Sequence, residues 1–587
     1  RQARQPLAHE PLRVRGEEVF ELVPLTLPSS NPPDTPRESE AMRLLLDRLA
    51  DAGITHDWFA GKDDLMIQIC HRLDGIPLAI ELAARQAHML SPALLLKALD
   101  DRIDVLSSGP RDGPRRHSSM RSAIEWSYDR LSPGAKELFT VLSVFAGGFT
   151  QETAAAVNPA LDSDRSFDTC FAELVDRHLV IGAADASRFH MLFVIREFAA
   201  ETLRAKGREE EAWRTCVDYF ISFAETCAEL LLGSRYSATL DDLSAEAANI
   251  RGALALCKAN DWIDEGLRLA GALGEYWIRR GLFAEGLDSL RSFLQAAAAE
   301  ESEHVGRASY HLARLLRIAG GQMFSWNVSV PECKAALERS LWHARKEGDR
   351  ALEAVALVTL GAMDWTLPLE KRFDIVDRAV LVAKELEDPW VESYCIRIAN
   401  SYLPRRDKPL SDLVAALEEA VSLAEQTGDR VLLCSAVHGV GDVYLLQREY
   451  EGAEPWYRQS LAIARELDDP FEIVAVLDHL AQIYASRNEL SSAKAVVREG
   501  LEIARRYGAQ AYIGSMLGYC AQLFWNDGRM EEACCMWGAA SRLVRMIRDA
   551  RLRLIPEEGW AQRLWDEGIA MSKEDAAAAA FAYLRED

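Results

Sequence analysis

Apolar residues recur at helical spacing over more than half of the chain, from about residue 210 to 545. Within this stretch an alanine returns at a fixed place in a shared pattern, at Ala344, Ala383, Ala424, Ala464 and Ala504. Successive members of this series are about 40 residues apart. A second series, placed after the next turn, has the same spacing: Ala453, Ala493 and Ala533. The pattern therefore predicts a repeat of helical hairpins.

Small residues at a fixed place allow the two helices of a hairpin to approach closely. Hairpins that cannot bury their apolar faces alone must stack, which produces an α-solenoid. The array resembles tetratricopeptide repeats lengthened beyond their usual period of about 34 residues. Tryptophans lie at scattered places in the array and indicate either core packing between helices or part of a ligand groove: Trp262, Trp277, Trp342, Trp390, Trp456 and Trp525.

The N-terminal part begins with a short strand-like run, Val19 to Leu25, and a Pro-rich linker, Pro28 to Pro36. Helical spacing starts at Ser39 and continues in a second helix over about 63–73. A third helix follows over 78–90, and Pro77 stands at its start, where a missing N–H is tolerated. Residues 107–116, rich in Gly, Pro, Ser and Arg, indicate a further linker.

Residues 118–206 have a different pattern. Helices are expected over Ser122 to Leu131, Ala135 to Phe145 and Phe167 to Arg177. Two strand-like runs follow, His178 to Gly182 and Arg188 to Phe193, joined by a small polar turn. Helices followed by a hairpin form the outline of a winged helix. The expected fold class is thus mainly α, with a helical domain, a winged helix (α+β) and a long α-solenoid.

The composition narrows the class of function. The chain has 587 residues, 49% hydrophobic and 27% charged, as in ordinary globular proteins. A net charge of −24 disfavours binding of nucleic acid by the chain as a whole. The eleven cysteines contain no Cys-x-x-Cys pair, and neither a signal peptide nor a stretch suited to span lipid is found. We expect reduced thiols, no membrane partner and a cytoplasmic location.

Catalytic constellations are missing from the sequence. The Gly61-Lys62 pair has His56 where a phosphate loop needs Gly, and Asp63 where it needs Ser or Thr. No metalloprotease or nucleophile-elbow motif occurs. The pairs Cys70-His71 and Cys534-Cys535 lack further ligands at metal spacing. We therefore expect no catalytic residue, no metal site and no ATP hydrolysis by this chain.

One segment, Cys70 to Ala84, carries a family resemblance. Its Asp-Gly-Ile-Pro-Leu-Ala closely resembles the Gly-Leu-Pro-Leu-Ala helix of the signal-transducing STAND ATPases, which include bacterial AfsR-like and large LuxR-type transcription regulators. Further segments resemble the same family in the same order: Ala3 to Leu7, Val14 to Glu17, Ala123 to Leu131, Leu142 to Phe149, Arg188 to Phe198 and Gly568 to Ala576. The resemblance covers essentially the whole chain.

The resemblance implies nucleotide-binding roles for four residues: Arg4, Gly75, Pro77 and Leu78. Arg4 matches an arginine that senses a nucleotide phosphate, and Pro77 starts the helix next to the adenine. The family's switch trio, Met-His-Asp or Met-Leu-Glu, reads Met191-Leu192-Phe193 here, so its polar contact to the nucleotide is missing. The phosphate loop and the acidic strand for Mg²⁺ would lie before residue 1.

The family also implies a division into five parts. They are the end of a nucleotide-binding domain with a linker (1–36), an ARC-like helical domain (37–112), the winged helix (113–208), the solenoid (209–545) and a helical cap (546–587). ATP or ADP with Mg²⁺ would be bound only by the full-length protein, and DNA only through a domain outside this chain.

The resulting hypothesis is the switch-and-sensor part of an intracellular bacterial transcription regulator. A small-molecule or protein inducer would bind the superhelical groove of the solenoid. The first helix of each repeat, with faces such as Tyr512 to Phe524, would line one side of this groove, and the activated protein would self-associate. An adaptor without enzymatic activity, built on a solenoid beside a decayed nucleotide module, is the alternative. An enzyme with its own active site is the least favoured class.

Overall fold

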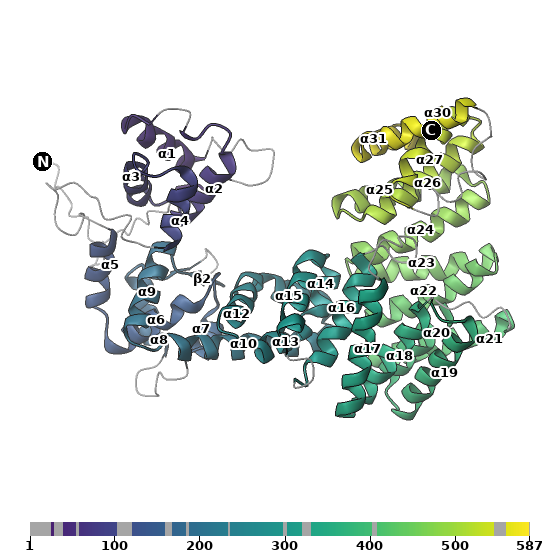
Figure 1. The fold of residues 1–587 in the computed structure, drawn as a ribbon, viewed down its shortest axis with the longest axis horizontal. Helices are drawn as coiled ribbons and strands as arrows, with labels where there is room; N and C mark the ends of the chain where they lie inside the picture. The colour runs from purple at the N-terminus through teal and green to yellow at the C-terminus, as the bar shows by residue number, and fades with distance from the viewer. Residues whose placement is uncertain are drawn as a thin grey trace, which may run out of the picture. The chain divides into compact units, whose positions relative to one another are not determined.

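The computed structural model describes residues 25–28, 39–54, 58–101, 120–158, 167–182, 187–232, 235–297, 302–319, 330–364, 366–401, 408–544 and 559–585. The fold is mainly α, as the sequence predicts, and consists of two compact units (Figure 1). The first unit contains residues 1–220 and 246–256, and the second contains residues 221–245 and 257–587. The finer five-part division stays a prediction.

The first unit begins with four helices: α1 (Glu40–Asp51), α2 (Asp63–Arg72), α3 (Pro77–Gln86) and α4 (Pro92–Asp101). Ser39 caps α1, because its hydroxyl accepts from the Met42 N–H, and Pro77 is the first residue of α3. Helix α1 packs on α3, and α2 packs on α4. The strand predicted before Leu25 and the two linkers, apart from Leu25 and Pro28 themselves, lie outside the described residues.

The next elements are helices and one short hairpin. They are α5 (Met120–Asp129), α6 (Pro133–Val141), the 3-10 turn η5 (Leu142–Val144), α7 (Gln151–Ala156), α8 (Phe167–Asp176), β1 (Ile181–Gly182), β2 (Phe189–His190) and α9 (Phe193–Ala205). Helix α6 packs on both α8 and α9. The rings of Tyr128 on α5, Phe139 on α6 and Phe198 on α9 pack against one another. The predicted order of helices followed by a hairpin is therefore present.

The hairpin is shorter than the sequence predicts. Strands β1 and β2 are antiparallel, with Ile181 opposite His190. On its other side, Phe189 exchanges two backbone hydrogen bonds of 2.7 Å with Phe149. The prediction of a strand continuing to Phe193 is wrong, because the chain leaves the ladder after His190 and Phe193 opens α9.

Helices alone build the rest of the described chain. The first group is α10 (Glu209–Leu230), α11 (Tyr236–Ala245), α12 (Ala247–Ala259), α13 (Ile263–Ala272), α14 (Gly274–Arg279), α15 (Phe283–Ala296) and α16 (Val305–Ala319). The repeats follow as α17 (Val330–Glu347), α18 (Arg350–Met363), α19 (Leu369–Glu385), α20 (Pro389–Ser401), α21 (Leu410–Thr427), α22 (Arg430–Leu446), α23 (Tyr450–Glu466), α24 (Pro470–Ser486), α25 (Leu490–Arg506), α26 (Gln510–Asn526) and α27 (Met530–Ser541). The last helices are α30 (Gly559–Ala570) and α31 (Lys573–Leu584).

The predicted solenoid is present in the second unit. Each helix from α17 to α27 packs against the next, and α18 also contacts α20, as α20 contacts α22 and α24 contacts α26. The even-numbered helices α18 to α26 thus form one layer, called here the inner helices, and the odd-numbered helices form the outer helices. Helix α30 packs on α27, and α31 on α25, α26 and α27.

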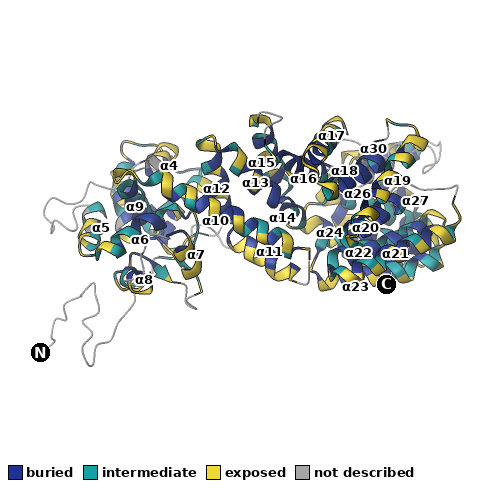
Figure 2. Ribbon diagram, turned by 90° about the horizontal axis from the view of Figure 1, so that it is seen from below, coloured by how far each residue is buried: buried dark blue, intermediate teal, exposed yellow. Residues whose placement is uncertain are grey.

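Close packing explains the alanine pattern. All the alanines of both series lie on outer helices and are at most 1% exposed. A larger side chain at these places would separate the helices of a hairpin, because protein interiors are close-packed. Figure 2 shows that the repeat helices carry both buried and exposed residues.

Two class predictions can be compared with the structure. All eleven cysteines are free thiols, and ten of them are buried, so no disulfide is formed. In the part of the chain that the structure describes, no helix combines the length and the apolar character needed to cross a membrane.

Two glycines allow the closest helix contact of the C-terminal region. A Cβ on Gly568 in α30 would overlap the carbonyl oxygen of Cys535 in α27, and one on Gly538 would overlap that of Trp565. Gly559, at the start of α30, has open space around its Cα.

We predict that Gly568→Ala weakens this contact by about 2 kcal/mol, because backbone atoms cannot move aside as a flexible side chain does. Amide hydrogen exchange in α27 and α30 should accelerate by more than about tenfold. The matched variant Gly559→Ala should leave exchange nearly unchanged. Equal exchange in both variants would contradict the close contact.

Candidate functional site

The nucleotide-motif residues lie at the start of α3. Gly75 has φ +65°, and a Cβ there would overlap the backbone carbonyl of Leu25, whose N–H donates to Gly75 O at 3.0 Å. Glycine is thus needed both for the left-handed backbone and for the close approach of the preceding segment. Pro77 is exposed, and Leu78 is the second residue of α3. Arg4 lies outside the described residues.

The switch trio meets this motif through a residue that the sequence reasoning missed. Asp74, directly before Gly75, accepts a hydrogen bond from the Phe193 N–H with its Oδ2 atom. Helix α9 has no side-chain cap of its own at Leu192, so Asp74 satisfies one of its unpaired first-turn N–H groups from another element. Met191 is buried beside the end of the hairpin. The one sign of this contact in the sequence is that the motif contains an acidic residue, Asp74, directly before Gly75.

Charged groups surround the Asp74 contact. Burial raises the pKa of Asp74, and the Phe193 N–H and the Arg196 guanidinium oppose this shift. The guanidinium groups of Arg72 and Arg196 lie 5.1 and 5.6 Å from the centre of the Phe193 ring. Position 193, which is polar in the trio of the family that the sequence resembles, thus carries an aromatic ring near two cations.

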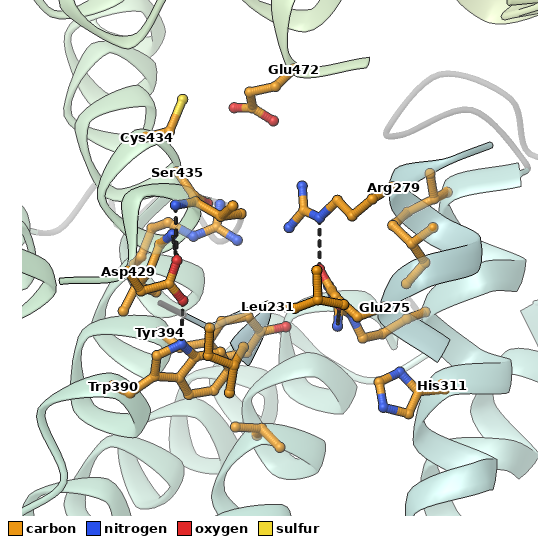
Figure 3. A pocket seen from close by; sticks show the side chains of 18 of the residues that line it. Leu231, Glu275, Arg279, His311, Trp390, Tyr394, Asp429, Cys434, Ser435 and Glu472 are labelled. Atoms are coloured by element: carbon orange, nitrogen blue, oxygen red, sulfur yellow. Dashed lines mark hydrogen bonds and ion pairs between the residues drawn. The ribbon is translucent and has the colours of Figure 1, made fainter. Parts of the chain in front are cut away.

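The second candidate site is a cavity of about 450 Å³ in the solenoid unit. Its walls come from the end of α10, from α13, α14 and α16, and from the inner helices α18, α20, α22, α24 and α26. Figure 3 shows Glu275 and Arg279 on one wall, with Trp390, Tyr394 and Asp429 opposite. A volume of this size holds a small-molecule ligand.

A repeated aspartate begins the inner helices at the cavity. Asp349, Asp388, Asp429 and Asp469 each accept backbone N–H groups of the first turn of α18, α20, α22 and α24. An aspartate cap stabilises a helix start by about 1 kcal/mol. All four line the cavity, and they follow the same period as the alanines. The repeat that predicts the solenoid therefore also brings four carboxylates to one cavity.

A buried ion-pair chain crosses the cavity wall. Arg279 Nε lies 2.7 Å from Glu275 Oε1, and its Nη1 lies 3.0 Å from Asp469 Oδ2. Arg314 also pairs with Glu275. Burial alone would raise the pKa of Glu275, but Arg314 and Arg279 hold it well below its usual value. The chain joins α14 and α16 to α24, although Arg279 and Asp469 are 190 residues apart.

The opposite wall is aromatic. Trp390 Nε1 donates to Asp429 Oδ2 at 2.8 Å, and the Trp390 and Tyr394 rings stack at 5.4 Å with an interplanar angle of 6°. The Tyr310 hydroxyl donates to the Tyr394 hydroxyl at 3.1 Å. The sequence indicated either core packing or a ligand groove for the tryptophans of the array. Trp390 lines the cavity, whereas Trp277 is buried in the core.

Several buried polar atoms at the cavity lack a hydrogen-bond partner. They are His311 Nδ1, Arg314 Nε, Asp478 Oδ1 and His479 Nδ1. Burial and then the charge of Arg314 lower the pKa of His311 to about 3, so its ring is neutral at neutral pH. An unpaired buried polar atom costs about 1–3 kcal/mol, which a ligand with matching groups can recover.

One prediction about this site was only partly right. Tyr512 lines the cavity, as expected for an inner helix face. Phe524, at the other end of the same predicted stretch, is buried and stacks on Tyr583 of α31 at 4.0 Å. The end of α26 therefore packs on the C-terminal helices and offers no groove.

Comparison with known proteins gives a match in the repeat region and relatives among bacterial proteins. Residues 432–506 match the family model for the tetratricopeptide repeat. A Mycobacterium tuberculosis (strain H37Rv) protein named "Putative HTH-type transcriptional regulator" is 29% identical over 435 residues, covering 72% of this chain and 47% of the relative. The predicted resemblance to bacterial transcription regulators is confirmed. A second M. tuberculosis protein, named as uncharacterized, is 31% identical over 207 residues, 34% of this chain and 50% of its own length.

The chain spans about half the length of the curated relatives it matches. Among solved structures, it is similar to a STAND protein with a tetratricopeptide repeat sensor from Pyrococcus horikoshii. The identity is 12% and the TM-score is 0.41, and the match covers 86% of this chain and 74% of that protein.

We predict that Glu275→Ala lowers the free energy of unfolding at pH 7 by about 3 kcal/mol, because it leaves Arg314 buried without a carboxylate. The unperturbed pKa of a glutamate is 4.5, and in the folded protein the pKa of Glu275 lies well below this value. The ion pairs of Glu275 therefore stabilise the fold fully above pH 4.5, and this stabilisation is lost as the pH falls towards the lowered pKa. The difference between wild type and variant should therefore shrink in acid. Urea unfolding at several pH values measures it.

The control is Glu225→Ala, which breaks an exposed pair with Arg268 of 2.6 Å. It should change stability by less than about 1 kcal/mol, because water screens such pairs. A similar loss in both variants, at every pH, would show that the buried chain has no special role.

Proposed function

We propose that this chain is the switch-and-sensor part of a bacterial transcription regulator, and that the solenoid cavity binds its signal ligand. The observation that carries the proposal is the cavity of about 450 Å³, with cations, carboxylates and stacked aromatic rings on its walls. The named regulator among the relatives supports the regulatory context. DNA would be bound by a part of the protein outside this chain.

The chemistry of the walls indicates the ligand class. Arg314 Nε and His311 Nδ1 offer nitrogen atoms, and the capping aspartates Asp349 and Asp388, which use only Oδ1 for their helix, offer carboxylate oxygens. A molecule with both charges and an apolar part, such as a short peptide, would match both walls and the Trp390–Tyr394 stack. Tetratricopeptide-like solenoids commonly present such concave binding surfaces.

The switch is proposed to work through nucleotide in the full-length protein. Arg4, Gly75, Pro77 and Leu78 would contact ATP or ADP, and Asp74 would transmit the state to α9 through Phe193. Helix α9 is followed after three residues by α10, whose last part belongs to the second unit. Ligand binding would shift the population towards an active, self-associating form.

The cavity assignment can be tested by filling it. Ser435→Trp on α22 places a large ring in the cavity, and Ser491→Trp on outer helix α25 is the exposed control. In a thermal-shift screen of a defined tetrapeptide library, hits should stabilise the wild type and Ser491→Trp but not Ser435→Trp. Hits that stabilise all three equally, or a library without any hit, would contradict this site or this ligand class.

The chain is proposed to have no ATPase activity of its own, because its sequence contains no phosphate loop. Phosphate release with Mg²⁺ and ATP should equal the blank. Turnover well above the blank would refute this. The alternative function, an adaptor with a decayed nucleotide module, predicts a different result for the full-length protein. Calorimetric titration with ATP or ADP would then show no binding.

A further inference from the structure

Two histidines and an aspartate converge on the cavity beside the ion-pair chain. His438 and Asp442 lie one helical turn apart on α22 and therefore on one helix face, and His479 reaches them from α24. One nitrogen of each histidine and one carboxylate oxygen lie within 4.8 Å of one another. All three residues are partly buried and line the cavity.

The distances among these atoms are informative. His438 Nε2 is 3.5 Å and His479 Nε2 is 3.6 Å from the same oxygen, Asp442 Oδ1. Both distances exceed the usual range of about 2.7–3.2 Å for an N–H···O hydrogen bond. Ligand atoms about 2.1 Å from a tetrahedral zinc ion are separated by about 3.4 Å along the edges of the tetrahedron. The two nitrogen–oxygen distances thus match the separation of ligand atoms around one ion.

Surrounding groups orient two of the three side chains. His438 Nδ1 lies 2.8 Å from Glu472 Oε1, and because a carboxylate only accepts, Nδ1 donates and Nε2 is left with its lone pair towards Asp442. A carboxylate behind a ligating histidine is the usual outer partner in metal sites. Tyr457 donates to Asp442 Oδ1 at 2.9 Å.

Packing fixes the third side chain. The His479 ring stacks on Tyr457, with centroids 5.0 Å apart and an interplanar angle of 25°. It also meets the His438 ring edge-on at 5.1 Å. This packing directs Nε2 of His479 to the same point as the other two ligand atoms.

We propose that His438, Asp442 and His479 bind a divalent transition-metal ion of the zinc type inside the solenoid cavity. Two imidazoles and one carboxylate suit Zn²⁺ and its neighbours in the first transition row, and they exclude Ca²⁺ and Mg²⁺, which prefer oxygen ligands. Three protein ligands would leave one tetrahedral position open for water or another ligand, and the three residues line the cavity. The metal site does not depend on the signal ligand proposed above.

The sequence reasoning missed this site because its ligands belong to two repeats. The pair His438 and Asp442 is visible at helical spacing, but His479 belongs to the next repeat and is one position out of register with His438. Only the packing of α22 beside α24 brings the third ligand into place.

Calorimetric titration of Zn²⁺ into the chain freed of metal with a chelator tests the proposal. One tight equivalent is expected, and Kd should rise at least about 100-fold in His438→Gln, Asp442→Asn and His479→Gln. Glu472→Gln, which removes only the outer carboxylate, should raise Kd by about 10–100-fold. The control is His304→Gln, at a histidine near the exposed Asp264 and Glu303, and it should bind as the wild type does.

Cobalt absorption of the wild-type chain gives a second readout that does not depend on the folding of variants. Co²⁺ in this site should show tetrahedral d–d bands without a thiolate charge-transfer band. Thiolate absorption, tight binding that persists in His479→Gln, or a wild type that binds no equivalent tightly would each overturn the proposal.

Discussion

The bridge formed by Arg279 between Glu275 and Asp469 is the interaction on which the cavity depends. Stacked repeats normally contact only their neighbours, so few direct links are expected between distant helices of the second unit. Arg279 joins α14 to α24 across 190 residues, with both partners strongly buried. Removing three charges from water is expensive, and the cost is offset only because each charge meets an opposite one at short distance. The bridge thereby joins distant helices of the cavity wall.

The capping aspartates connect this bridge to the repeat itself. Asp429 and Asp469 each use Oδ1 for the first-turn N–H groups of an inner helix, and Oδ2 for a side chain of the wall. One residue thus begins a helix and shapes the cavity. The repeat period fixes where these carboxylates fall, so the polar character of the cavity follows from the same pattern that stacks the hairpins.

Much of the fold could be predicted from local pattern, and much of the site could not. The alanines of the outer helices predict the solenoid because close helix contact needs small residues at regular places. The glycine and proline of the Gly75 motif predict a turn into α3. In the structure, the φ of Gly75 and its close contact with Leu25 leave no room for a side chain. The contact of Asp74 with Phe193, and that of Arg279 with Asp469, joins segments 119 and 190 residues apart, which no periodicity reveals. The strand expected to reach Phe193 ended early because the start of a helix competed for the same residues.

The unpaired polar atoms of the cavity set a physical condition on its function. His311 Nδ1 and Arg314 Nε are buried without partners in a wall that also carries the Glu275 ion pairs. Apolar residues packed closely at these places would leave no polar atom unpaired, so the observed arrangement is less stable than an apolar one could be. A ligand that satisfies these atoms contacts α16, and one that also satisfies Asp478 Oδ1 and His479 Nδ1 contacts the inner helix α24 as well. Binding of such a ligand to the proposed site would tighten contacts between repeats that are not neighbours, and the gain in free energy would be shared by the whole stack. In a solenoid, whose repeats otherwise respond one pair at a time, such a ligand converts local binding into a change of the complete unit.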